Sequence, residues 1–98
     1  MNAGSIINNI KSYIDNVGGS YSEWYVGISK DARYRLFVEH SVDENSDNWI
    51  YRTAFNSEIA RQVEKYFLDI IGTDGGTGGG DDSTNMVYAY KKNSHTNP

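Results

Sequence analysis

The sequence predicts an α+β domain in which a small three-stranded mixed sheet is flanked by about three helices. Three segments carry apolar residues every three or four positions, which is the spacing of amphipathic helices. Three other segments are short and rich in aromatic and β-branched residues, which favour strands. The order is helix, strand, helix, strand, helix, strand, typical of a sheet covered by helices. Because a chain of 98 residues supports only one modest core, we expect one domain at residues 1–90 and a polar tail at 91–98.

The first helix is predicted between Ser5, a candidate N-cap, and the pair Gly18-Gly19, which ends it. Its apolar stripe consists of Ile6, Ile7, Ile10, Ile14 and Val17. A helix with one apolar face must bury that face. If the small sheet does not cover the stripe alone, the helix packs between subunits, so a homo-oligomer is one alternative.

The next element is a strand predicted at residues 20–29, where apolar and other residues alternate with a period of two. Its apolar positions are Trp24, Val26 and Ile28. Ser29 or Asp31 then begins a second helix, which runs to about His40. This helix carries Ala32, Leu36 and Phe37 on one side. The turn-rich stretch SVDENSDN at 41–48 predicts a loop.

The remaining elements are a strand at WIYRTAF (49–55), a third helix, and a strand at MVYAY (86–90). Asn56 or Ser57 caps the third helix. The apolar stripe of this helix consists of Ile59, Ala60, Val63, Phe67 and Ile70. The polar tail KKNSHTNP follows the last strand, and we expect it to fray because polar chain ends are usually poorly ordered.

Composition and charge exclude several classes of protein. The chain has no cysteine, so neither a disulfide framework nor a thiolate site is available. No apolar run approaches the ~18 residues of a membrane span, and the first residues lack the pattern of a signal peptide. We therefore expect a cytoplasmic protein with no membrane partner. The net charge of −4 argues against binding through broad neutralisation of phosphates.

Residues 72–85, GTDGGTGGGDDSTN, hold six of the ten glycines. The segment follows a helix and precedes a strand, which is the reverse of a P-loop or a dinucleotide-binding loop. One alternative is a flexible connector. The other is a loop that binds a ligand or partner, because its N–H groups can surround an anion, and Asp81 and Asp82 can bind a cation or a basic partner.

Residues that suit phosphodiester chemistry follow one another along the chain. Tyr25-Val26-Gly27 lies in the first predicted strand. Arg35 stands eight positions after the glycine, and Glu64 borders the apolar stripe of the third helix. This order, over most of the chain, resembles the GIY-YIG nuclease family. The resemblance implies a small sheet flanked by helices and a metal-dependent phosphodiesterase that acts on DNA or RNA.

The resemblance also implies a role for each of these residues. Tyr25 would orient or activate the attacking water, and Arg35 would clamp the phosphate with its two-pronged end. Glu64 would hold one Mg²⁺, with water and substrate completing the coordination shell.

Two further residues are implied by the family pattern, with departures from it. The family's histidine, where present, lies four positions after the arginine, whereas His40 lies five after it. The family's first tyrosine strand is not in its usual place. Tyr88, or Tyr90, on the last strand would supply that tyrosine in a permuted arrangement.

Each polar residue also has a simpler structural alternative. Arg35 and Glu39, four apart on one helix, would form a solvated ion pair. Glu64 would pair with Arg61, or near Lys65, on an exposed edge. His40 would cap its helix as an imidazolium that the helix dipole stabilises.

Two function classes follow, and one geometric condition separates them. A nuclease requires Tyr25, Arg35 and Glu64 to converge in one cleft. The alternative is a non-catalytic acidic module that holds a nucleotide-like ligand or a protein partner in the same cleft and in the glycine-rich segment. Small acidic proteins of this kind include inhibitors of the counter-defence type, which occupy a nucleic-acid-binding surface by charge mimicry.

Overall fold

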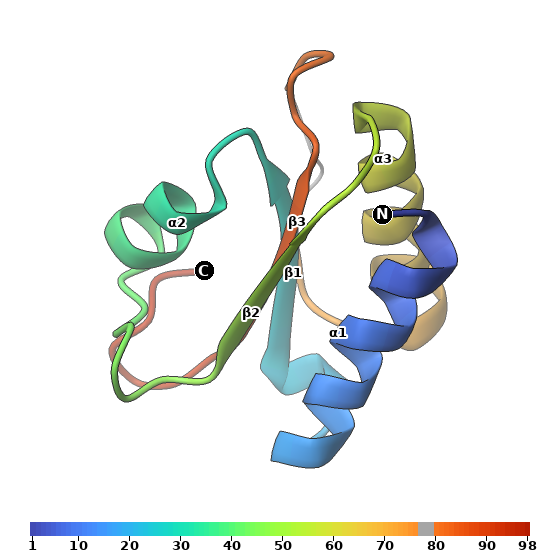
Figure 1. The fold of residues 1–98 in the computed structure, drawn as a ribbon. Helices are drawn as coiled ribbons and strands as arrows, with labels where there is room; N and C mark the ends of the chain where they lie inside the picture. Colours follow the sequence, from blue (N-terminus) through green and yellow to red (C-terminus); the bar gives the residue numbers. More distant parts are fainter. Residues whose placement is uncertain (77–79) are drawn as a thin grey trace.

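The computed structural model describes residues 1–76 and 80–98. In chain order the elements are α1 (Ala3–Val17), η1 (Tyr21–Glu23), β1 (Trp24–Ser29), α2 (Ala32–Tyr34), η2 (Arg35–Glu39), β2 (Trp49–Thr53), α3 (Ser57–Tyr66), η3 (Phe67–Ile71) and β3 (Met86–Lys91). Here η1 is a 3₁₀ turn, while η2 and η3 are π turns that continue α2 and α3. The α+β class and the predicted order of helices and strands are confirmed (Figure 1).

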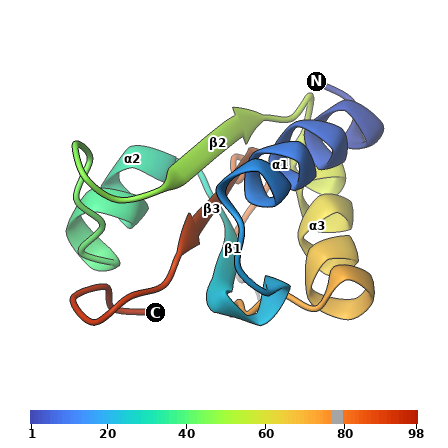
Figure 2. The same ribbon diagram turned by 90° about the horizontal axis from the view of Figure 1, so that it is seen from below.

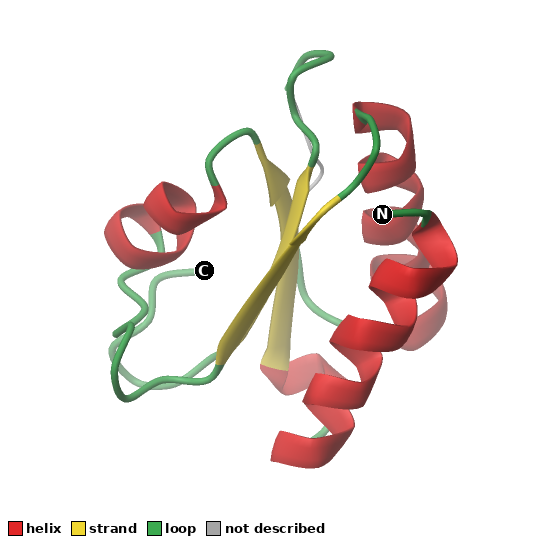
Figure 3. Cartoon of the chain, viewed as in Figure 1, coloured by secondary structure: helices red, strands yellow, loops and turns green. Residues whose placement is uncertain are grey.

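The three strands form one sheet with the order β1-β3-β2, so the last strand of the chain is its centre. Figure 3 shows this sheet between the helices. Both pairings of β3 are antiparallel, where the prediction was a mixed sheet. Parallel pairing among the described residues is limited to one bridge between Tyr25 and Asp74, on the outer edge of β1. In this register Tyr88 lies opposite Gly27 on one side and Tyr51 on the other.

Helices α1 and α3 cover one face of the sheet, and α2 with η2 covers the other (Figures 1 and 2). The first face contains the larger apolar core, to which α1 contributes Ile6, Ile10 and Ile14, each at most 1% exposed. The stripe of α1 is therefore buried inside the domain by the sheet and α3. Because the sheet and α3 cover this stripe, it does not need a partner subunit to bury it, although the oligomeric state itself stays a prediction.

The helix ends differ from the predictions at two places. Asn2, not Ser5, is the N-cap of α1, because the helix begins at Ala3 and the Asn2 side chain accepts a hydrogen bond from Ser5 N at 2.8 Å. Ile70 was assigned to the stripe of the third helix but is 69% exposed. In η3 the Gly72 N–H donates to Phe67 O, and this wider turn rotates Ile70 away from the core.

The second face of the sheet carries a smaller, aromatic core. It consists of Tyr25, Ala32, Leu36, Val42, Tyr88 and Tyr90. All six residues of β1 are buried, because helices cover both faces of the strand. The alternation in this strand therefore separates an apolar face from an aromatic one, instead of separating a buried face from a solvated one.

The C-terminal segment after β3 turns back along this aromatic face, and its end lies beside α2 (Figure 1). The tail is predicted to fray, but Asn97 N donates to His40 O at 2.7 Å. Asp47 accepts hydrogen bonds from Asn93 Nδ2 at 2.8 Å and pairs with His95 Nε2 at 2.5 Å. A polar tail is held here by hydrogen bonds to buried and half-buried groups, which its composition does not reveal.

Two isoleucines test the burial of α1. Ile10→Ala should lower the free energy of unfolding by about 2–5 kcal/mol, because it leaves a cavity in the larger core. The matched control Ile70→Ala removes the same atoms from an exposed site and should change that free energy by about 0.5 kcal/mol or less. Urea denaturation of both variants gives the comparison. Equal losses in the two variants would contradict the burial of the α1 stripe within one domain.

Candidate functional site

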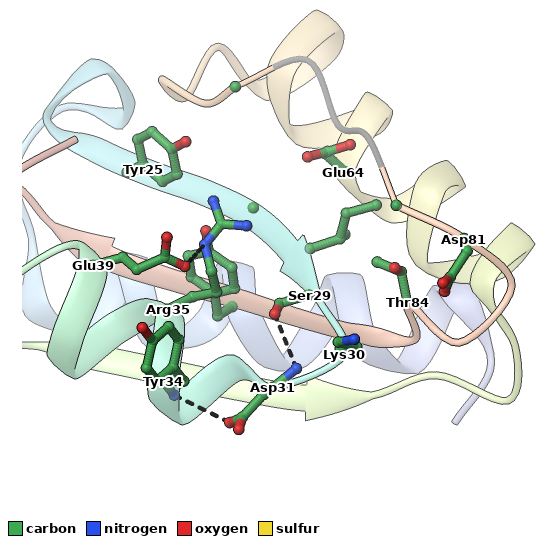
Figure 4. A pocket seen from close by; sticks show the side chains of 15 residues that line it. Tyr25, Ser29, Lys30, Asp31, Tyr34, Arg35, Glu39, Glu64, Asp81 and Thr84 are labelled. Carbon is green, nitrogen blue, oxygen red and sulfur yellow. Dashed lines mark hydrogen bonds and ion pairs between the residues drawn. The ribbon is translucent and has the colours of Figure 1, made fainter.

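A cleft of about 540 Å³ opens beside β1, an edge strand of the sheet, between η2, α3 and the two described ends of the glycine-rich segment (Figure 4). Four of the five predicted site residues line it: Tyr25, Arg35, Glu64 and Tyr88. The fifth, His40, lies behind Tyr88 and contacts its hydroxyl group. The geometric condition for the nuclease hypothesis, convergence in one cleft, is met.

Tyr25 and Tyr88 come from adjacent strands and form the aromatic wall of the cleft. Their ring centroids lie 6.3 Å apart with an interplanar angle of 19°. Burial raises the pKa of both hydroxyl groups, so both are neutral phenols at neutral pH. They can orient water or a ligand through hydrogen bonds without adding charge to the cleft.

Gly27 explains why a glycine follows Tyr25 by two positions. Both residues point to the cleft side of β1, and Tyr88 of the central strand lies directly opposite Gly27. A Cβ atom at Gly27 would lie 2.5 Å from the Tyr88 hydroxyl oxygen and 2.6 Å from Cζ. The absence of a side chain here leaves the space that the Tyr88 ring occupies.

Arg35 opens η2 and extends its guanidinium between Tyr25 and Glu64 (Figure 4). Its Nε atom lies 3.0 Å from Glu39 Oε1, so the ion pair that the sequence offers as an alternative exists. Both side chains are more than a third exposed, and such a pair contributes at most about 1 kcal/mol. Among the described residues the two Nη groups have no hydrogen-bond partner, so they are available to an anionic ligand.

Glu64 is the acidic group of the cleft on α3. It is only 8% exposed, and its carboxylate makes no hydrogen bond to another described residue. Burial raises its pKa, and the nearby Arg61 and Arg35 oppose that shift. The predicted pairing with Arg61 on an exposed edge is not found, because Arg61 instead donates to Gly80 O at 2.8 Å.

Glu64 could supply one carboxylate ligand to a metal ion in the cleft. Within residues 1–76 and 80–98, no three His, Cys, Asp or Glu side chains gather as a set of metal ligands. One buried, unpaired carboxylate in an open cleft suits Mg²⁺, which keeps several water ligands and takes one or two carboxylates plus substrate oxygens. Glu64 is therefore the residue that would hold it.

His40 is brought to the cleft wall by the π turn η2. The main-chain N–H of His40 donates to Arg35 O, five residues earlier, at 2.8 Å. A π turn contains one residue more than an α-helical turn, so His40 lies near the side of the helix that carries Arg35. The ring is 4% exposed, and its Nε2 atom lies 2.8 Å from Tyr88 Oη. Burial lowers the pKa of the ring, so His40 is neutral and is not the exposed imidazolium cap that its position at a helix end suggests.

The structure separates the two tyrosines of the last strand. Tyr88 lines the cleft. Tyr90 stacks on Tyr25, with ring centroids 5.3 Å apart, and its hydroxyl oxygen lies 3.1 Å from His40 Nδ1. Tyr88 and Tyr90 are two residues apart on β3, so both side chains lie on the same face of the sheet. Sequence does not show which of the two lies at the cleft.

Several lining residues were not predicted as site residues. Lys30 and Asp31 follow β1 directly, Tyr34 ends α2, and Thr84 precedes β3. Their closeness in sequence to Tyr25 and Tyr88 was the available signal, since residues just beyond adjacent strand ends meet at one edge of a sheet.

The glycine-rich segment contributes to the site at both of its described ends. Asp74 pairs with the edge of β1, donating to Trp24 O at 2.8 Å and accepting from Val26 N at 2.9 Å. Gly76 and Asp81 line the cleft. The segment is therefore anchored at its start instead of serving only as a connector, and its residues 77–79 lie outside the described residues.

Comparisons with protein-family models, with curated proteins and with solved structures found no match to this chain. Over the parts of the chain that the structure describes, none of the helices combines the length and the apolar composition needed to cross a membrane.

Gly27→Ala should destabilise the domain by about 1–3 kcal/mol, because the new methyl group overlaps the Tyr88 ring. The control is Gly4→Ala in α1, where a Cβ atom would lie 3.7 Å from its nearest neighbour, Asn2 Oδ1. That change should be neutral or stabilising by up to about 1 kcal/mol. Thermal or urea unfolding measures both. A Gly27→Ala variant as stable as the wild type would contradict the packing of Tyr88 against the glycine.

Glu64→Gln should make the domain more stable at pH 7 than the wild type. Because burial raises the pKa of Glu64 above its ordinary value of 4.5, the wild type has its full stability below pH 4.5 and loses some as pH rises through the folded-state pKa. Glutamine does not ionise, so the difference should vanish near pH 4. Urea denaturation at pH 4 and pH 7 tests this, with the exposed Glu58→Gln on the same helix as control. A wild type at least as stable as Glu64→Gln at pH 7 would contradict the burial cost.

Proposed function

We propose that this domain is a GIY-YIG-like, metal-dependent phosphodiesterase that cleaves nucleic acid in the cleft. The proposal depends on one observation: Tyr25, Arg35 and Glu64, which are far apart in sequence, line the same cleft. They come from three separate elements, β1, η2 and α3. Arg35, with free Nη groups, faces the buried and unpaired carboxylate of Glu64 across the pocket. Neither a structural ion pair nor core packing alone requires such an arrangement.

The permuted arrangement is supported by the place of β3. This strand comes last in the chain yet pairs with both other strands. β3 places Tyr88 beside Tyr25. A tyrosine from another strand therefore lies next to the Tyr-Val-Gly strand, although residues 1–23 contain no strand before β1.

Each residue has a task that its surroundings support. Arg35 binds the scissile phosphate through its Nη groups and stabilises the charge that develops on it. Glu64 holds Mg²⁺, and the metal, when bound, supplies charge stabilisation for the leaving oxygen. Tyr25 positions the attacking water at the aromatic wall.

Tyr88 and His40 together remove the proton of that water. As the water O–H bond breaks, its proton moves to Tyr88 Oη, while the proton of Tyr88 moves to His40 Nε2 at 2.8 Å. The hydroxyl of Tyr88 stays protonated throughout, which agrees with its raised pKa. The net change is one proton transferred from water to His40.

The test is cleavage of labelled single-stranded, duplex and branched DNA, and of RNA, with Mg²⁺ or Mn²⁺. Glu64→Gln and Arg35→Lys should each lose about 100-fold or more of the wild-type rate, because a transition-state contact is removed and lysine lacks the two-pronged geometry. The exposed Glu58→Gln variant is the control and should cut at the wild-type rate. Cleavage that survives Glu64→Gln would point to a contaminating nuclease and would contradict the proposal.

A second candidate function is supported by the charges of the cleft. Four carboxylates, those of Asp31, Glu39, Glu64 and Asp81, line it, against the two cationic groups of Lys30 and Arg35. Such a lining disfavours a long polyanion that depends on many phosphate contacts. If well-folded wild type cuts none of the substrates, a binding module for a nucleotide-like ligand or a protein partner becomes the better assignment.

A further inference from the structure

We infer that the C-terminal segment, residues 92–98, is a working part of the site, because the main-chain carbonyl group of Asn97 sets which nitrogen of His40 carries the ring proton. The tautomer of His40 in turn sets the direction of its hydrogen bond with Tyr88. The consequence for catalysis rests on the proposed function, whereas the tautomer itself does not.

The tautomer follows from the chemistry of two contacts. Asn97 O lies 2.8 Å from His40 Nδ1, and a carbonyl oxygen only accepts hydrogen bonds, so Nδ1 carries a proton. The ring is buried and neutral, so it has only that one proton. The other nitrogen, Nε2, is therefore a bare acceptor, and the Tyr88 hydroxyl 2.8 Å away donates to it.

This direction is the one that proton removal requires. With its hydrogen directed at His40, the Tyr88 oxygen keeps its lone pairs free to accept a proton from a water that enters from the cleft, although Tyr88 itself is 0% exposed. When the Tyr88 proton then moves to Nε2, His40 becomes an imidazolium, and the Asn97 carbonyl dipole at Nδ1 stabilises that cation. Asn97 acts through His40 and is a positioning residue.

The alternative tautomer of His40, with its proton on Nε2, also has a hydrogen-bond donor for Nδ1. The Tyr90 hydroxyl lies 3.1 Å from the same Nδ1 atom. Without the Asn97 carbonyl, Tyr90 donates to Nδ1, and the ring proton moves to Nε2. Nε2–H then donates to Tyr88 Oη, so His40 no longer accepts the Tyr88 proton.

Two sets of contacts hold the part of the segment that leads to His40. Asn97 N donates to His40 O at 2.7 Å, beside the carbonyl contact. Nearer to β3, the Asp47 carboxylate binds both Asn93 Nδ2 and His95 Nε2, and the Asp47 side chain is only 7% exposed. The loop between η2 and β2 therefore fixes the path of the segment toward His40.

The experiment is ¹⁵N NMR of the His40 ring at pH 8, where a protonated and a bare ring nitrogen have clearly different shifts. In the full chain we expect Nδ1 protonated and Nε2 bare. A full chain with Nε2 protonated overturns the inference. Deletion of residues 94–98 should move the proton to Nε2, and adding Tyr90→Phe to the deletion should abolish that preference.

Matched variants separate the carbonyl group from the rest of the segment. Asn97→Ala keeps the main-chain carbonyl and should keep the wild-type tautomer. If the deletion variant does not fold, Asp47→Ala in the full chain replaces it, because it releases the anchor and should populate the Nε2–H form. A folded deletion or Asp47→Ala variant whose tautomer is unchanged also overturns the inference.

Cleavage kinetics then distinguish this inference from the proposed function. Where the wild type cuts, the deletion should lower kcat about 100-fold or more with KM little changed, since general-base catalysis contributes about 10²–10⁴. The exposed Glu58→Gln variant, outside this segment, is the control and should keep the wild-type kcat. If the wild type cuts nothing, the proposed function fails, while the NMR result still decides the role of Asn97. A deletion that shifts the tautomer and leaves kcat unchanged overturns the catalytic consequence.

Discussion

The pairing of β3 with both other strands is the constraint on which the rest of the structure depends. Strands β1 and β2 make no ladder with each other, and each is hydrogen-bonded only to the strand that comes last in the chain. Until Met86–Lys91 is in place, no sheet exists to cover α1 and α3 on one side or η2 on the other. The residues that make these contacts are far apart in sequence. The chain therefore loses the entropy of closing long loops before packing of the core stabilises the fold.

The two faces of this sheet have different physical characters, and the site takes its aromatic residues and Arg35 from one of them and Glu64 from the helix that covers the other. The face under α1 and α3 is packed mostly with aliphatic side chains, together with Trp24 and Phe67, and α3 contributes Glu64 to the cleft. The opposite face is packed with tyrosines and one histidine, which bury large apolar areas while each keeps a polar group that needs a partner. A hydrogen-bonded network around His40 is the result, and the cleft opens where Gly27 leaves room for Tyr88.

The polar groups of the cleft are held under conditions that a purely structural role would not favour. Glu64 is buried without a hydrogen-bonding partner among the described residues, and η2 adopts a π turn that is rarer than a continuous α-helix. Such local costs are expected where function and stability compete for the same side chains. The network also reaches beyond the cleft, since the ring of His40 links Tyr88 to the far end of the chain.

The sequence by itself determined the α+β class, the order of the elements and the burial of most apolar stripes, because these follow from local periodicity and capping. It also indicated Tyr25, Arg35 and Glu64 as residues that would share one cleft, which they do, while their chemical roles are proposals. Only the tertiary structure decided that β3 is central, that η2 carries His40 to Tyr88, and that residues 92–98 are anchored. Strand order, the depth of a side chain and the path of a polar tail depend on contacts between residues far apart in sequence, which local patterns do not encode.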